Sequence, residues 1–323
     1  MASLKEIKTR IGSVRSTLKI TSAMKLVASA KLRKAQQAVA AALPYQETLS
    51  GVLSALLADY ASKEREGGSP WDVFSVEKEG GRVALVAVAS NSSLCGGFNA
   101  NAARGASAVL AEFPEATVFS VGRKMAEAMK RAGYQSPKDY SKLSERPSYA
   151  GAALLAEELI DGFLDGRYSR VELVYNHFAS TASQPTIRET LLPFAPHPEA
   201  SPCHSEPSSC HFEPVEKSPS HPEADPSCHT EASGRAYLLP VDNIVEPGTE
   251  SVLSVLIPKV LKFKLYSILL DSAAAEHAAR TVAMQTATDN AEDILRDLTL
   301  EYNKGRQQKI TAEILDIVGG SML

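Results

Sequence analysis

The stretch LKEIKTRIGSVRSTLKIT, residues 4–21, carries apolar side chains at alternating steps of three and four residues. This heptad spacing keeps a narrow apolar stripe on one side of a helix, as is typical of helices that pair in coiled coils. Ser3 and Glu6 fit a capping box at the start of such a helix. The sequence therefore predicts a helix that begins almost at residue 3. The stripe consists of Leu4, Ile7, Ile11, Val14, Leu18 and Thr21.

The same helix can extend well beyond residue 21. Residues 2–43 contain no proline and one glycine, Gly12, and the pattern resumes after Pro44 to about Ala61. A proline inside so strong a pattern kinks a helix rather than ending it. At 1.5 Å per residue, a helix of about 40 to 55 residues makes a rod of roughly 60 to 80 Å. We assign residues 1–61 to an N-terminal coiled-coil helix.

A second long helix is predicted at the other end of the chain, over residues 249–323. After Pro258 the sequence has no further proline, and VGGS, residues 318–321, is the expected stop signal. Apolar residues keep the same rhythm of three and four in two places, from residue 295 to 302 and from 310 to 317. These residues are Leu295, Leu298, Tyr302, Ile310, Ile314 and Ile317.

The two terminal helices carry opposite charge. Residues 1–36 hold nine Lys or Arg and one acid, a net charge of +8, whereas residues 285–323 hold seven acids and four bases, a net charge of −3. Narrow stripes on oppositely charged helices favour an antiparallel coiled coil, and the alternative is two ordinary bundle helices. The basic residues of the first helix alternate with aliphatic rather than aromatic ones, which favours an acidic protein partner or solvent over nucleic acid.

The central part of the chain has a different pattern, in which apolar runs alternate with helical segments. Such alternation is typical of a parallel, Rossmann-like sheet, and we assign it to residues 82–195 and 235–248. The predicted fold class is α/β, an antiparallel coiled coil of long N- and C-terminal helices plus a central Rossmann-like α/β domain. Expected strands are 82–90, 116–122, 170–178, 184–194 and 236–241, and expected helices are 99–113, 123–133 and 153–166.

Residues 196–234 interrupt this domain with a low-complexity segment. Its 39 residues include eight Pro, eight Ser, seven acids and one Lys. Such a segment buries too little apolar surface to offset the entropy of ordering it, so we expect a disordered or loosely ordered insertion. It also holds Cys-His pairs at 203–204, 210–211 and 228–229. Their C-x6-C spacing and acidic, proline-rich flanks do not fit a structural zinc site.

The overall composition is that of a globular protein without a disulfide scaffold. The chain has 323 residues, of which 44% are apolar, a net charge of −4 and four cysteines, three of them in the insertion. These values argue against a dedicated nucleic-acid binder and favour a reducing compartment. The basic N-terminus lacks the apolar run of a signal peptide, and no stretch reaches the roughly 18 apolar residues of a membrane span. We expect a cytosolic protein, or one held at a membrane by its partners.

The turn SNSSLCGGFNAN, residues 90–101, follows the first expected strand and resembles a phosphate-binding turn at the start of a helix. It has neither G-x-x-x-x-G-K-S/T nor G-x-G-x-x-G, so a tight turn with Cys95 packed nearby is favoured over a nucleotide site at Gly96 and Gly97. Outside the insertion the histidines are His177 and His277, and neither has a carboxylate and a nucleophile near it in sequence. Structural roles are therefore favoured for both, and no catalytic, cofactor or metal site is predicted.

Three stretches together resemble a known family, the gamma subunit of F-type ATP synthases. They are ITSAMKLVASAKLRKAQ (20–36), SLCGGFNAN (93–101) and AARTVAMQTATDNAEDILRDLTLEYNKGRQQKITAEILDIVGG (278–320). The resemblance implies a non-catalytic rotor whose coiled coil stands inside a ring of alpha and beta subunits. It also implies that the α/β domain lies against the epsilon subunit and the membrane c-ring, on the cytoplasmic face of a bacterial plasma membrane.

The resemblance also carries residue roles to this chain. It implies that Arg306, Gln307, Thr311 and Glu313 contact a loop of the beta subunit. Met24 matches a position beside that contact region, where the family's coupling is sensitive to added charge. Its neighbour is Lys25, where some relatives have an acid.

The insertion departs from the family's pattern. Cys203 and Cys210 lie roughly where photosynthetic relatives carry a redox-regulatory dithiol loop, which suggests a thiol switch. An acidic, proline-rich loop without such a role is the alternative. For the whole chain, the alternatives to a rotor are a nucleotide-dependent Rossmann-like enzyme with helical arms and a basic coiled-coil adaptor for nucleic acid.

Overall fold

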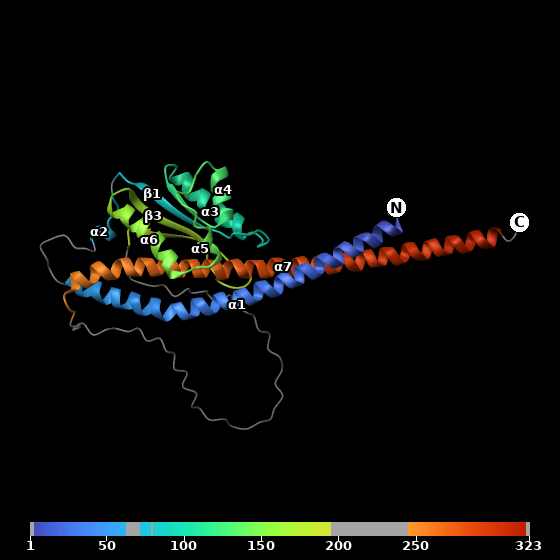
Figure 1. The fold of residues 1–323 in the computed structure, drawn as a ribbon, viewed down its shortest axis with the longest axis horizontal. Coiled ribbons are helices and arrows are strands. Elements are labelled where there is room, and N and C mark those ends of the chain that lie inside the picture. Colours follow the sequence, from blue (N-terminus) through green and yellow to red (C-terminus); the bar gives the residue numbers. More distant parts are fainter. Residues whose placement is uncertain (1–2, 63–71, 79, 195–244, 321–323) are drawn as a thin grey trace, which may run out of the picture.

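The computed structural model describes residues 3–62, 72–78, 80–194 and 245–320. Two long helices run side by side, α1 (Leu4–Ser62) and α7 (Thr249–Gly320), and a small α/β domain sits on one flank of the pair (Figure 1). With 59 and 72 residues, they are about 90 and 110 Å long. Pro44 and Pro258 lie inside the helices, so neither proline ends one. We call the paired part of α1 and α7 the rod.

The two helices of the rod are antiparallel, as predicted. Near one end, Leu4 lies against Gly305, where an added Cβ would be 3.1 Å from the Leu4 side chain. Further along, the Thr288 hydroxyl donates to Thr21 Oγ1 at 3.0 Å, and the Ser267 hydroxyl donates to Gln46 Oε1 at 2.7 Å. Positions early in α1 therefore face positions late in α7.

The stripe of α1 follows the predicted heptads. Its members are buried or half-buried, whereas most residues between them are exposed. The capping box is also confirmed, because the Ser3 amide donates to Glu6 Oε2 and the Glu6 amide donates to Ser3 Oγ, both at 3.3 Å. The stripe continues beyond Thr21 through Ala28, Leu32, Leu49, Leu53 and Leu56.

The surroundings of α7 change twice along its length. Residues 253–279 are buried on most sides, because α1 lies against one side and the α/β domain against another. From Met284 to Gly305 a narrow buried or half-buried stripe remains, which includes Leu295, Leu298 and Tyr302. Beyond Gly305 the side chains that the structure describes are exposed. We call residues 306–320 the tip.

The α/β domain contains a four-stranded sheet of order β2-β1-β3-β4. The prediction of a parallel sheet is right for β1, β2 and β3 and wrong for β4, which pairs antiparallel with β3. The link from β3 to β4, residues 177–185, is too short for the crossover that parallel strands require. The strands are β1 (Arg82–Val88), β2 (Thr117–Val121), β3 (Tyr168–Asn176) and β4 (Thr186–Leu192).

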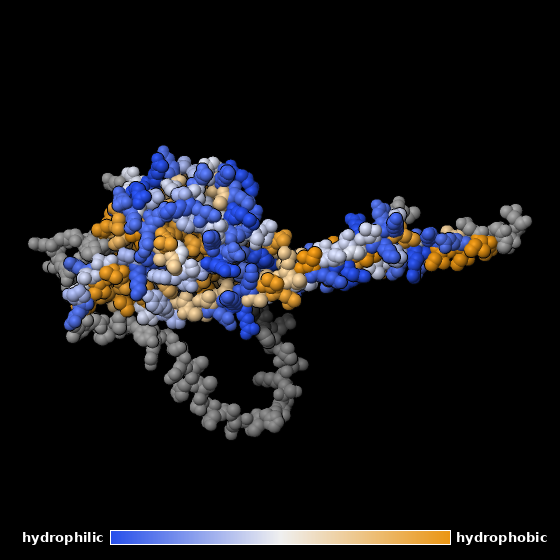
Figure 2. Space-filling model, in the orientation of Figure 1, coloured by the Kyte–Doolittle hydropathy of each residue, from blue (hydrophilic) through white to orange (hydrophobic). Residues whose placement is uncertain are grey.

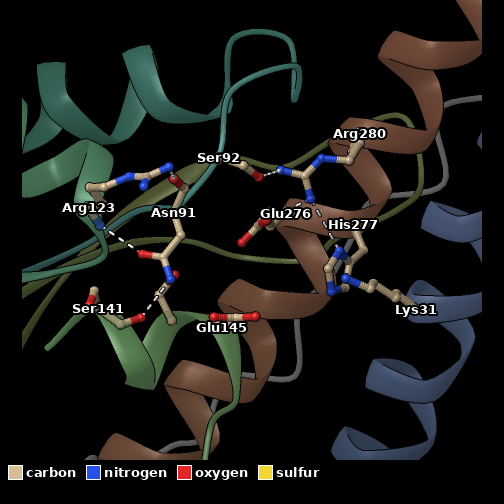
Figure 3. A pocket seen from close by; sticks show the side chains of 10 residues that line it. Lys31, Asn91, Ser92, Arg123, Ser141, Glu145, Glu276, His277 and Arg280 are labelled. Atoms are coloured by element: carbon tan, nitrogen blue, oxygen red, sulfur yellow. Dashed lines mark hydrogen bonds and ion pairs between the residues drawn. The ribbon is translucent and has the colours of Figure 1, made fainter. Parts of the chain in front are cut away.

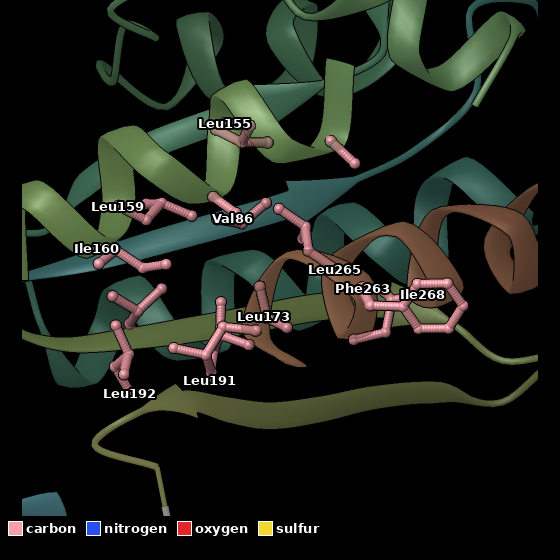
Figure 4. Packing of buried hydrophobic residues seen from close by; sticks show 14 of the residues in the cluster. Val86, Leu155, Leu159, Ile160, Leu173, Leu191, Leu192, Phe263, Leu265 and Ile268 are labelled. Atoms are coloured by element: carbon pink, nitrogen blue, oxygen red, sulfur yellow. The ribbon is translucent and has the colours of Figure 1, made fainter. Parts of the chain in front are cut away.

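Helices cover both faces of this sheet. Side chains such as Val86 and Leu173 point to one face, where α6 and α7 supply Leu155, Leu159 and Leu265 (Figure 4). Alternate side chains of β1 point to the other face and pack on α3 and α4. Part of α7 therefore belongs to the core of the α/β domain as well as to the rod. The helices are α2 (Asp72–Ser75), α3 (Phe98–Glu112), α4 (Arg123–Arg131), α5 (Ser141–Glu145) and α6 (Tyr149–Leu164).

Two sequence predictions concern residues outside the described part of the chain. They are the insertion at 196–234 with Cys203 and Cys210, and the strand at 236–241. Among the described residues, none of the helices is both long and apolar enough to cross a lipid bilayer.

Candidate partner-binding surfaces on the rod

The tip presents the four residues that the resemblance assigns to a beta-subunit contact. Arg306, Gln307, Thr311 and Glu313 are all exposed. The Thr311 hydroxyl donates to the Gln307 carbonyl at 2.9 Å, and Glu313 lies 3.8 Å from Lys309, two contacts within α7 itself. These side chains stand on a single helix because α1 begins only at Leu4, opposite Gly305. They are therefore open to a partner from all sides of the helix.

Apolar side chains on the tip are just as exposed. Ile314, Leu315 and Ile317 keep 55%, 64% and 72% of their surface open to solvent. Ile310, Ile314 and Ile317 continue the predicted rhythm, yet no segment of α1 reaches them. Figure 2 shows this apolar surface along the projecting end of the molecule. Exposed apolar surface of this extent marks a site that another protein covers.

A second exposed surface lies on α1, around Met24. Four exposed apolar residues lie there within about two helical turns, with Leu26 on a different side of the helix from the other three, and we call them the collar surface. Lys25 is half-buried beside them, on the stripe that faces α7. The collar surface consists of Ile20, Met24, Leu26 and Val27.

The structure does not bring the two surfaces together. Thr21 faces Thr288, so Met24 lies opposite about residue 285 of α7, some 20 residues from Arg306. At 1.5 Å per residue this separates Met24 and Lys25 from Arg306 by about 30 Å along the rod. The six predicted contact residues thus form two separate patches, on the tip and on the collar.

The α/β domain is fastened to the rod by polar contacts from the ends of its strands. His177, just after β3, lies with Nδ1 2.7 Å from Asp271 Oδ2, and the Phe178 amide donates to Asp271 Oδ1 at 3.2 Å. Arg280 donates to Ser92 Oγ at 2.8 Å and to Glu276 Oε1 at 2.7 Å. His177 and Asp271 are 94 residues apart in the sequence, and Ser92 and Arg280 are 188 residues apart. No sequence spacing indicated these contacts.

The turn after β1 forms an apolar contact with the same helix. Cys95 and Phe98 are buried against Ala275 and Ala279 of α7. Gly96 has a φ of +58°, and an added Cβ there would lie 3.8 Å from the Ala283 methyl group. A left-handed turn at this position favours glycine. The expectation that Cys95 packs beside a tight turn is confirmed, and this part of the turn joins the domain to the rod.

Burial perturbs two ionisable groups of α7 at this junction. The pKa of His277 is lowered to about 4 by burial and by the positive charges of Arg280 and Lys31. The pKa of Glu276 is raised by burial, although Arg280 opposes the rise. In the described residues no group of three or more His, Cys, Asp or Glu side chains is placed to hold a metal ion.

Together, the fold and these surfaces define a class of protein, a two-helix rod that carries an α/β domain and offers exposed patches to other proteins. A family model described as ATP synthase matches residues 3–322. The chain is 47% identical to the ATP synthase gamma chain of Phocaeicola vulgatus, over 100% of both chains. It is 40% identical to that of Parabacteroides distasonis, over 99% of both. The chain belongs to the ATP synthase gamma-chain family.

Solved structures share the fold at low sequence identity. A chain of the rotor of the Euglena gracilis mitochondrial ATP synthase superposes with a TM-score of 0.58 at 17% identity, covering 95% of this chain and 98% of that one. A chain of the Tetrahymena thermophila mitochondrial central stalk and c-ring gives 0.52 at 20% identity, covering 83% and 99%.

Proposed function

We propose that the chain is the central rotor shaft of a proton-translocating F-type ATP synthase. It couples rotation of a membrane c-ring to the conformational cycle of catalytic sites in the beta subunits, and it catalyses no reaction itself. The observation that carries this proposal is the tip, a single helix that projects roughly 20 Å beyond α1 with its apolar side chains exposed. Exposed apolar side chains on a projecting helix mark an interaction site, and we take the surrounding subunits to be the protein that covers it.

The proposed partners follow from the family. They are the alpha and beta subunits around the rod, and the epsilon subunit and c-ring at the α/β domain. Support comes from the solved relatives, whose chains are described as parts of a rotor, a central stalk and a c-ring assembly. In a bacterium these partners hold the chain at the cytoplasmic face of the plasma membrane, as a peripheral protein.

The junction between domain and rod supports a mechanical role. Torque applied to the α/β domain has to reach the tip without slippage, and α7 takes part in the domain's core as well as in the rod. The contacts of Asp271 and Arg280 add directional bonds to this packing. Contacts of the collar surface and of the tip with the surrounding subunits then transmit the rotation to the catalytic sites.

Charge reversal at the tip tests the proposal. In an assembled complex carrying Arg306→Glu, we expect less proton pumping per ATP hydrolysed, because a carboxylate replaces a cation that meets a beta-subunit loop. Folding is unaffected, since Arg306 is exposed and pairs with no carboxylate in the described part of the chain. The measurement is the quenching of a pH-sensitive fluorescent dye as membrane vesicles acidify, divided by the ATPase rate of the same vesicles. Arg306→Lys keeps the charge and serves as the control, and wild-type pumping in Arg306→Glu would contradict the proposal.

A thiol switch in the insertion is a separate regulatory proposal. Cys203 and Cys210 form a disulfide on oxidation that slows rotation, so ATPase activity of the oxidised complex is expected to rise with a dithiol reductant. Cys203→Ser abolishes the rise, and Cys228→Ser, in the same insertion, leaves it intact. Equal activity of the oxidised and reduced wild-type complexes excludes the switch.

Co-purification separates the rotor from its rivals. A rotor purifies with alpha and beta subunits, whereas a nucleotide-dependent enzyme or a nucleic-acid adaptor does not. The adaptor would also bind DNA with a strong dependence on salt as an isolated chain.

A further inference from the structure

A polar cavity of about 390 Å³ lies where the α/β domain meets the rod. Figure 3 shows that its walls come from α1, from α7 and from the α/β domain, which contributes α5, the start of α4 and the loop after β1. The loop after β1 and the start of α4 directly follow β1 and β2, so the cavity lies at the carboxyl ends of two parallel strands. In open α/β sheets this edge is where ligands bind. The lining residues are Lys31, Asn91, Ser92, Arg123, Ser141, Ser144, Glu145, Glu276, His277 and Arg280.

The loop after β2 is held tightly against the end of β1. Gly122 has a φ of +99°, and a Cβ there would overlap the Ala89 carbonyl oxygen, so a larger residue is excluded. The next amide, of Arg123, donates to Asn91 Oδ1 at 2.8 Å, and the Arg123 guanidinium donates to the Asn91 carbonyl at 2.9 Å. The Asn91 side-chain Nδ2 in turn donates to the Ser141 carbonyl at 2.7 Å. This wall of the cavity is therefore fixed before any ligand arrives.

Three cations and two carboxylates line the cavity. Lys31, Arg123 and Arg280 face Glu145 and Glu276, and Arg123 also lies 4.0 Å from Glu127, which does not line the cavity. Glu276 is taken up by Arg280 at 2.7 Å, and both side chains are largely buried, with 11% and 15% of their surface exposed. Among the described residues, Lys31 has no carboxylate within ion-pair distance. An unpaired ammonium group thus borders the cavity from α1.

His277 lies beside two of these cations. Its Nδ1 lies 3.5 Å from an Arg280 nitrogen, and Figure 3 shows the ring between Arg280 and Lys31. Since Nδ1 faces a group that can only donate, the neutral ring carries its proton on Nε2. The two cations and burial together keep the imidazole neutral. The neutral ring therefore adds an Nε2–H donor to the cavity lining, beside the unpaired Lys31 ammonium.

We propose that this cavity binds a phosphate-type oxyanion, held by the Lys31 ammonium, the Arg280 guanidinium and the His277 Nε2–H. Charge-assisted hydrogen bonds from cations suit tetrahedral oxyanions, and the Ser141 hydroxyl adds a neutral donor. The shared chemistry is a phosphate group, which free phosphate and the terminal phosphate of a nucleotide both provide. A bound anion links α1, α7 and the α/β domain and so strengthens the junction between rod and domain.

Calorimetric titration of the purified full-length chain tests this site, with phosphate as the probe at constant ionic strength. Lys31→Gln is expected to weaken phosphate binding about tenfold or more, because it removes one charge-assisted hydrogen bond. The control is Lys34→Gln, one turn further along α1 and exposed outside the cavity. Its affinity is expected to match that of the wild type. A parallel titration with ADP distinguishes a nucleotide from free phosphate as the source.

The imidazole of His277 provides a readout at the site itself. With histidine labelled by carbon-13, and its signal assigned through His277→Gln, saturating phosphate is expected to raise the pKa of His277, since an anion offsets the two cations. Equal affinities of Lys31→Gln and Lys34→Gln, or a His277 pKa unmoved by both phosphate and ADP, would overturn the proposal. Because the isolated chain is titrated, this outcome does not depend on whether the chain is a rotor.

Discussion

At the scale of single residues, His277 is a group whose ionisation the fold opposes. Its ordinary pKa is 6.5, and in the folded chain it is lowered to about 4 by burial and by Arg280 and Lys31. Between these two values the unfolded chain binds a proton that the folded chain does not. Stability contributed by the neutral ring is thus present above about pH 6.5 and is lost as the pH falls toward 4.

A comparison of wild type with His277→Gln isolates this effect. The free energy of unfolding of the wild type is expected to fall, relative to the variant, by roughly 1 to 2 kcal/mol between pH 7 and pH 4.5, after allowance for screening by solvent. Urea unfolding followed by circular dichroism measures it. The charged neighbours Lys31, Glu145, Glu276 and Arg280 are present in both chains. A difference between the chains that is constant with pH would show that His277 titrates normally in the fold.

At the scale of elements, the long helices differ in how far the sequence predicts them. The stripe of α1 is readable because one face meets one partner, so heptad spacing and burial coincide. The middle of α7 cannot be read from heptad spacing in this way, since residues 253–279 contact both α1 and the sheet and are buried on most sides. The expected strands at 170–178 and 184–194 already leave too few residues for a parallel crossover, so the sequence holds the signal for an antiparallel β4 even though the alternation of strands and helices favours a parallel sheet.

The candidate site shows the same limit. Arg306 and its neighbours are exposed because α7 extends beyond the start of α1. The pattern of residues does not show where the pairing of the two helices ends. The contacts of His177 with Asp271 and of Arg280 with Ser92 depend on tertiary packing between distant segments. Sequence reasoning assigned His177 a structural role without a partner, and the fold supplied Asp271.

Removal of Asp271 is expected to loosen the junction between β3 and α7. Asp271→Ala leaves His177 and the Phe178 amide without their acceptor, which costs about 2 kcal/mol of unfolding free energy. The Phe178 amide also loses protection against hydrogen exchange, which locates the effect. Asp297→Ala, at an exposed position of the same helix, is the control and is expected to change stability by less than about 0.5 kcal/mol. Retained protection of the Phe178 amide in Asp271→Ala would show that the aspartate does not fasten the domain.

At the scale of the whole molecule, stability and function occupy different ends. The sheet, α6 and the middle of α7 form a large core, and the rod from Leu32 toward Leu4 is stabilised by one narrow stripe. Those side chains of the tip that the structure describes are exposed and belong to neither. Removal of the tip is therefore expected to leave the fold intact, whereas removal of the paired part of the rod is expected to destabilise it.

Truncation after Gly305 separates the two properties. The midpoint of thermal unfolding is expected to stay within about 2 °C of wild type, because residues 306–315 are exposed and no hydrogen bond or ion pair in the described part of the chain joins them to α1 or to the domain. Truncation after Thr286 is the comparison, and it lowers the midpoint since it also removes Thr288 and Leu298 from the paired stripe. In the assembled complex, truncation after Gly305 is by itself expected to reduce the number of protons pumped per ATP hydrolysed, measured in membrane vesicles. If the chain that ends at Gly305 pumped as well as the full-length chain, the tip would be no part of the coupling surface, and torque would have to pass through the collar surface around Met24.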